Sequence, residues 1–192
     1  YYQTTIDLDP GHAAAHYSLA YVLRAQGKPE EALVYLRKAS DLLPDDPSPL
    51  NGLAWELATC AEPKLRDPGQ AIFLARKVVA LSVKQGDDRD HPGRHGNYWN
   101  TLGVAHYRAG QLNEAVDALQ KSLDLGTGGG DRYICLDWYF LAMANWKLDR
   151  KDEARKWYDR AVEWTAKKGP KDDTLRRYRA EAAALLGIEG KE

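Results

Sequence analysis

Long apolar runs are absent from this sequence of 192 residues, although 44% of them are hydrophobic. A membrane-spanning helix needs roughly 18 or more consecutive apolar residues, and no stretch approaches that length. An excess of one charge sign is lacking as well, because 27 Lys and Arg stand against 28 Asp and Glu. The composition predicts a soluble folded chain with enough apolar surface for a core. It gives no general attraction to nucleic acid or to an anionic membrane.

Cysteine is scarce. Cys60 and Cys135 are the only two, they lie 75 positions apart, and neither belongs to a CxxC or Cys/His pattern. Disulfide frameworks and zinc sites need more cysteines at closer spacing, so we expect two reduced, buried thiols. Reduced thiols favour a reducing compartment, and we therefore expect a cytoplasmic protein.

Catalytic motifs are missing too. The sequence has no GxSxG, HExxH or DFG string, and the glycine run at 128–130 lacks the following Lys-Ser or Lys-Thr of a phosphate-binding loop. His91 and His95 have the i,i+4 spacing of zinc ligands on a helix, but Pro92 follows directly and disfavours that geometry. We predict no catalytic residues, no metal site and no cofactor.

The sequence does contain a pattern that occurs four times. A leucine recurs at positions 19, 53, 102 and 141, each directly followed by alanine or glycine. An alanine follows each pair further along, at positions 32, 71, 115 and 154. Each copy presents apolar residues at i, i+3, i+4 and i+7, which is typical of an amphipathic helix. Four copies of a multi-position pattern are a far stronger signal than one motif match.

The first copy shows which family the pattern resembles. Within 13–44, Leu19-Ala20, Gly27 and Ala32 have the spacing of a 34-residue tetratricopeptide repeat (TPR). The resemblance implies an all-α fold, a right-handed TPR solenoid of antiparallel helix hairpins with a C-terminal capping helix. Small residues such as Gly103 then allow paired helices to approach closely.

The spacing predicts one array over residues 1–188. Its parts are the second helix of a truncated repeat at 1–10, repeats at 13–46, 47–84, 96–126 and 132–168, and a capping helix at 172–187. The step from Leu53 to Leu102 is 49 positions rather than 34, which places a long loop near 85–97. Because the first repeat lacks its first helix, we expect the chain to be an excerpt of a longer protein.

In the family that this sequence resembles, the first helix of each hairpin lines a concave groove. Carried across, the partner-binding positions are Tyr17, Tyr21, Arg24, Asn51, Trp55, Asn100, Tyr107, Arg108, Tyr139, Met143, Trp146 and Lys147. Aromatic bodies with polar tips, interleaved with Arg, Lys and Asn, suit a peptide or helix laid in the groove. The alternative for any one of these aromatics is simple packing between neighbouring helices.

The family's carboxylate clamp for acidic C-termini depends on Lys, Asn and Arg. The matching positions here are not basic: Tyr17, Tyr21, Gly52, Asn97 and Thr101. The resemblance therefore disfavours clamp binding of chaperone tails. We expect the groove to prefer an aromatic or apolar segment with some acidic character near Arg24, Arg108 and Lys147.

Three hypotheses about function stay open at this level. The first is a non-catalytic protein–protein interaction scaffold that binds a peptide or protein partner. The second is a regulatory module of a larger bacterial signalling protein. Strings such as YWNTLGVAHYRAG are similar to a bacterial TPR subfamily found beside Ser/Thr kinase or WD40 domains. The third is weak self-association through the truncated N-terminal helix. Binding of nucleic acid rests only on a net charge of +5 over 147–179, and we do not expect it.

Overall fold

The computed structural model describes residues 1–86, 92–126, 131–168 and 171–188. Within that part of the chain it has ten α-helices, one short 3-10 helix and no strand. The chain divides into two compact units, Tyr1–Gln85 and Gly86–Glu192. The all-α fold class predicted from the sequence is confirmed.

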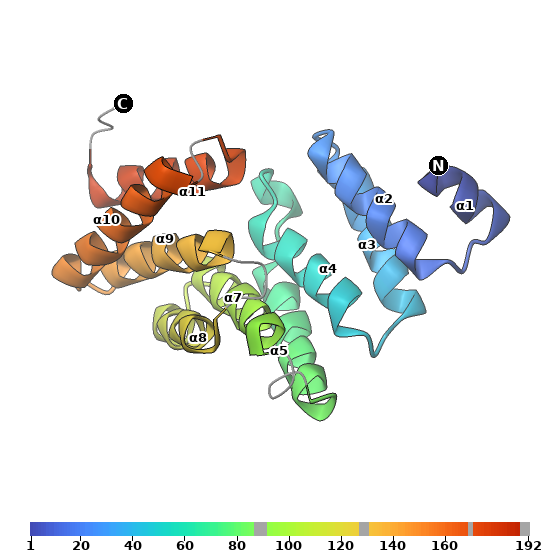
Figure 1. The fold of residues 1–192 in the computed structure, drawn as a ribbon, viewed down its shortest axis with the longest axis horizontal. Helices are drawn as coiled ribbons and strands as arrows, with labels where there is room; N and C mark the ends of the chain where they lie inside the picture. Colours follow the sequence, from blue (N-terminus) through green and yellow to red (C-terminus); the bar gives the residue numbers. More distant parts are fainter. Residues whose placement is uncertain (87–91, 127–130, 169–170, 189–192) are drawn as a thin grey trace. The chain divides into compact units, whose positions relative to one another are not determined.

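The first unit begins with a short helix and continues as two hairpins (Figure 1). The helices of this unit are α1 (Tyr2–Leu8), α2 (Ala13–Ala25), α3 (Pro29–Leu42), α4 (Pro47–Thr59) and α5 (Pro68–Lys84). Helix α2 pairs with α3, α4 pairs with α5, and α3 also packs against α4. The connection between α4 and α5 holds the 3-10 helix η1 (Pro63–Leu65).

Helix starts in the first unit follow from local sequence. Pro47 and Pro68 occupy the first turns of α4 and α5, where a missing backbone N–H costs no hydrogen bond. Asp46 and Asp67 precede them, and their carboxylates accept hydrogen bonds from the free N–H groups of Ser48 and Gln70. Both helices of the α4/α5 hairpin therefore have defined starting points.

The second unit has two hairpins and a final helix. The helices of this unit are α7 (Pro92–Arg108), α8 (Leu112–Leu125), α9 (Asp131–Lys147), α10 (Lys151–Lys168) and α11 (Asp173–Leu186). Helix α7 pairs with α8 and α9 with α10, while α11 packs against both α9 and α10. The sequence placed the start of this repeat at residue 96, but α7 begins at Pro92. The prediction was wrong because proline is well tolerated as the first residue of a helix.

Small residues lie where the paired helices meet. The repeated alanines at 32, 71, 115 and 154 are all 0% exposed. Gly103 of α7 lies directly on α8: a Cβ added there would be 2.6 Å from Cγ of Leu119 and 3.0 Å from its backbone nitrogen. The expectation that small residues allow close helix approach is therefore confirmed at this position.

Both cysteines are buried and neither forms a disulfide, as expected. Cys135 lies between α9 and α10, with its sulfur 3.3 Å from the hydroxyl of Thr165. Burial raises the pKa of the Cys135 thiol to about 11. The pKa of Cys60 is also raised, mainly by burial. Both thiols are therefore held in the protonated, unreactive form near neutral pH.

Replacing Gly103 by alanine tests the close contact between α7 and α8. The added methyl group overlaps Leu119, so we expect a loss of about 1–3 kcal/mol in the free energy of unfolding. This outweighs the gain of about 0.5–1 kcal/mol that alanine normally brings to a helix. Urea unfolding followed by circular dichroism measures the difference. Gly69→Ala is the control, because a Cβ there makes only an ordinary contact with Asp67. Equal stability of Gly103→Ala and wild type would contradict the packing argument.

Candidate partner-binding surface

An aromatic row lies on α2. Tyr17 and Tyr21 are one helical turn apart, their ring centroids are 4.9 Å apart in an edge-on arrangement, and their hydroxyl oxygens are separated by 2.9 Å. The guanidinium of Arg24 lies 4.7 Å from the centroid of the Tyr21 ring. Tyr21 is 41% exposed. These three residues thus form one pre-arranged surface with aromatic faces, hydroxyls and a cation.

Helix α4 completes this surface within the same unit. A Cβ at Gly52 would lie 2.6 Å from Cε2 of Tyr17, so the tyrosine ring rests directly on the α4 backbone. Arg24 reaches α4 as well, with its Nη1 atom 3.7 Å from Oε2 of the buried Glu56. Asn51 and Trp55 are half-buried and lie on the same side of α4 as Gly52 and Glu56, by helical spacing. We call this set the α2/α4 face.

The predicted partner-binding residues of the second unit differ from those of the α2/α4 face in how deeply they are buried. Four of them are buried, with exposed fractions of 4% or less: Asn100, Tyr107, Tyr139 and Met143. The hydroxyl of Tyr139 lies 2.9 Å from that of Thr165, so this ring packs against α10. The side chains of these residues have packing roles in the structure, which corrects the expectation that they line an open groove.

Helix α11 is the physical reason for this burial on α7. The two terminal guanidinium nitrogens of Arg108, Nη1 and Nη2, donate hydrogen bonds to the two carboxylate oxygens of Glu181 on α11. Phe140 lies between Tyr107 and Tyr178, at centroid distances of 5.4 and 4.9 Å. Burial alone would lower the pKa of Arg108, but the hydrogen bonds and charge of Glu181 leave it raised. The final helix therefore covers residues that the sequence assigned to a partner.

The expected preference for an acidic ligand stays a prediction, but its three cations already have contacts within the chain. Arg24 is already paired with Glu56, and Arg108 with Glu181. The ammonium of Lys147 lies 4.6 Å from the centroid of the Tyr107 ring. The remaining predicted residue, Trp146, is half-buried beneath the ammonium of Lys151, 3.9 Å from its ring centroid. Arg24, Arg108 and Lys147 thus have partners inside the chain, and each of these contacts joins two helices.

Sequence comparison agrees with this helical arrangement. Two tetratricopeptide repeat models match the chain, one over residues 1–34 and one over residues 94–163, together more than half of its length. The chain belongs to the tetratricopeptide repeat family. A comparison with curated proteins gives no match. The neighbouring kinase or WD40 domains expected from the sequence stay a prediction.

Two solved structures show what this TPR chain is similar to. One is the crystal structure of YrrB, described as a TPR protein with an unusual peptide-binding site. It is 16% identical, with a TM-score of 0.57, and the match covers 99% of this chain and 86% of YrrB. The other is MamA, residues 41 to the end, from Desulfovibrio magneticus RS-1. It is 21% identical, with a TM-score of 0.35, and the match covers 82% of this chain and 97% of MamA. At such identity the similarity to YrrB shows a shared fold.

The described part of the TPR chain offers no group of three or more His, Cys, Asp or Glu side chains that could hold a metal ion. His95 lies in that part, where its Nε2 accepts a hydrogen bond from the indole of Trp99 at 2.9 Å. His91, the other member of the histidine pair considered for zinc, lies outside the described residues. None of the described helices is long and apolar enough to cross a membrane.

Sequence reasoning missed a buried carboxylate in the TPR core. Asp137 of α9 is 0% exposed and accepts hydrogen bonds from Asn100 Nδ2 at 2.7 Å and Ser122 Oγ at 2.9 Å. It therefore ties α9 to α7 and α8. Burial raises its pKa from 3.8 to about 7, although both hydrogen bonds oppose the rise. An aspartate inside the otherwise apolar string ICLDWYFLAMA was the available signal.

The raised pKa of Asp137 makes stability depend on pH. Between about pH 4 and pH 7 the folded chain keeps a proton on Asp137 that the unfolded chain releases. The free energy of unfolding therefore falls as the pH rises through this window. We expect Asp137→Asn to gain stability relative to wild type across this window, on the order of 3 kcal/mol at its upper end. Urea unfolding at several pH values measures the difference. The exposed Asp159→Asn is the control. A difference that does not change with pH would contradict the assignment.

Proposed function

We propose that this TPR chain is a non-catalytic protein-interaction scaffold and that the α2/α4 face is a surface on which it binds a peptide or protein segment. The family membership supports the general class. The choice of face rests on one observation, the pre-arranged row on α2 in which Tyr17 is half-buried and Tyr21 and Arg24 are exposed.

The chemistry of the α2/α4 face suits a partner segment. Tyrosine and tryptophan supply large contact areas and lose little rotamer entropy when they are covered, so they dominate many interfaces. Tyr17 is already held against Gly52, and Tyr21 lies between Tyr17 and Arg24. A partner therefore meets a surface that needs little reordering, which favours affinity.

The type of segment follows from the charges that are already paired. Because Arg24 is bound to Glu56, the face presents aromatic rings and hydroxyl groups rather than a free cation. We therefore propose that this face binds an apolar or aromatic segment with hydrogen-bonding groups rather than an acidic one.

A paired affinity capture tests the proposal. One bait is the wild-type chain and the second carries Tyr21→Ala and Trp55→Ala. A matched control bait carries Tyr1→Ala and Tyr2→Ala, which removes two exposed aromatic residues at the start of α1 instead. Tyr107 is left unchanged because it is buried and its loss would affect folding. Circular dichroism confirms equal helicity of the three baits.

We expect proteins that wild type and the α1 control retain and that the Tyr21→Ala/Trp55→Ala bait loses. Peptides from such a protein are then measured by isothermal titration calorimetry. The double substitution should weaken binding by about 2 kcal/mol, roughly thirtyfold in Kd. Equal retention by all three baits would place the binding site elsewhere. If the wild-type bait enriches no protein from a lysate of the source cell, the scaffold proposal is contradicted.

A further inference from the structure

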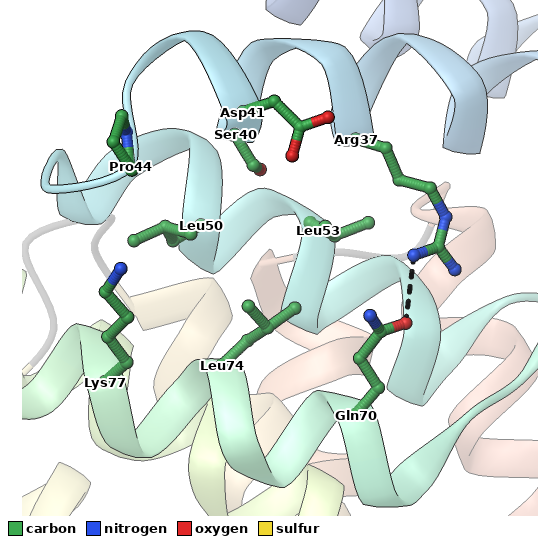
Figure 2. Close-up of a pocket in the computed structure, with 9 residues that line it drawn as sticks. All are labelled: Arg37, Ser40, Asp41, Pro44, Leu50, Leu53, Gln70, Leu74 and Lys77. Atoms are coloured by element: carbon green, nitrogen blue, oxygen red, sulfur yellow. Dashed lines mark hydrogen bonds between the residues drawn. The ribbon is translucent and has the colours of Figure 1, made fainter.

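A cavity of about 410 Å³ opens between α3, α4 and α5, all within the first unit. Figure 2 shows Leu50 and Leu53 of α4 and Leu74 of α5 beneath it, with α3 on the opposite side. These three leucines are 4–8% exposed, so they form an apolar floor. The volume lies at the lower end of the roughly 300–1,000 Å³ found for binding pockets, enough for one or two side chains.

Polar side chains from α3 and α5 stand at the rim of this cavity. At one end, Arg37 Nη1 donates a hydrogen bond to Oε1 of Gln70 at 3.0 Å (Figure 2). At the other end is Lys77, whose ammonium lies 3.8 Å from Asp45. Asp45 is 82% exposed, so this ion pair is solvated and contributes little. Within the described residues no carboxylate lies within 4.0 Å of Arg37.

The surroundings of the cavity are cationic and apolar together. Helix α5 carries Arg76, Lys77 and Lys84 and has no Asp or Glu in its 17 residues. Two large apolar side chains are strongly exposed near the end of the cavity where Arg37 is bonded to Gln70: Val34 at 64% and Phe73 at 68%. Val34 lies one helical turn from Arg37, and Phe73 lies one helical turn from Gln70, so both are next to the rim of the cavity. Asp41 is the one acidic residue among those that line the cavity.

We propose that this cavity is a second binding site, which takes an acidic and apolar segment of a partner protein. One Leu or Phe side chain of the segment enters above Leu50, Leu53 and Leu74. An Asp or Glu within one turn of it pairs with Arg37 or Lys77. Charge complementarity favours this occupant, because two cations, Arg37 and Lys77, stand against the single acidic residue Asp41 among the residues that line the apolar cavity.

The site is distinct from the α2/α4 face and does not depend on the function proposed for that face. On α4, Leu50 and Leu53 point into the cavity, whereas Gly52 and Glu56 lie against α2. At 100° per residue, Gly52 lies about 160° from Leu50 and about 100° from Leu53. Glu56 lies about 60° from Leu53, but Tyr21 and Trp55 do not line the cavity. The two surfaces can therefore be changed independently.

A peptide selection tests the proposal directly. A phage-displayed library of random peptides is selected on the wild-type chain, and enriched peptides are synthesised with a fluorescein label. Fluorescence anisotropy then gives Kd for wild type and for Arg37→Glu/Lys77→Glu. The matched control is Lys38→Glu/Lys84→Glu, which makes the same charge change on the same two helices but outside the cavity lining. Tyr21→Ala/Trp55→Ala reports on the α2/α4 face.

We expect one class of peptides with Leu or Phe close to Asp or Glu. Their Kd should weaken by about tenfold or more in Arg37→Glu/Lys77→Glu, and by about twofold or less in the control and in Tyr21→Ala/Trp55→Ala. Higher salt should weaken the same peptides. The proposal is overturned if no enriched peptide distinguishes the cavity variant from its control. It is also overturned if the peptides that do so lack acidic residues or depend equally on Tyr21 and Trp55.

Discussion

Close contact between paired helices at small side chains is the constraint on which the rest of this structure depends. A single amphipathic hairpin cannot bury its own apolar stripe, so neighbouring helices must cover it. The repeated alanines are fully buried, and Gly103 allows α7 to lie against Leu119 of α8 without a side chain between them. Larger residues such as Trp138 and Tyr158 are buried beside these close contacts.

This constraint also explains what the sequence could predict. Close helix pairing needs small and large residues at fixed positions, and such a pattern is visible along the chain without any structure. The four hairpins and the small residue at Gly103 were accessible in this way, whereas the buried thiols followed from the wide spacing of the two cysteines. The start of α7 was misplaced because Pro92 was taken only as a helix breaker, although proline also begins helices.

Contacts between elements far apart in sequence could not be predicted from the pattern. Tyr17 and Tyr139 occupy the same position of the repeat, two residues before the recurring leucine, yet only Tyr17 is accessible. The repeat pattern is identical for both, and the difference comes from tertiary packing. The cavity near Leu74 was missed for a related reason, since its walls come from helices whose exposed residues carry no motif.

The helix α4 illustrates how one element serves two surfaces. Its small residue Gly52 accepts the Tyr17 ring on one side, while Leu50 and Leu53 form the floor of the cavity on the other. A side chain larger than glycine at position 52 would displace Tyr17. The composition of α4 is therefore restricted on both sides.

The docking of α11 has a consequence for the order of assembly. Each hairpin forms from contacts between helices that are adjacent in sequence, which keeps chain-closure entropy low. The bond between Arg108 and Glu181 instead closes a separation of 73 residues. Its surroundings come from α7, through Tyr107, and from α9, through Phe140. Helix α11 thus finds its complete binding surface only once both hairpins of its unit are in place, and we expect it to be the last helix to consolidate during folding.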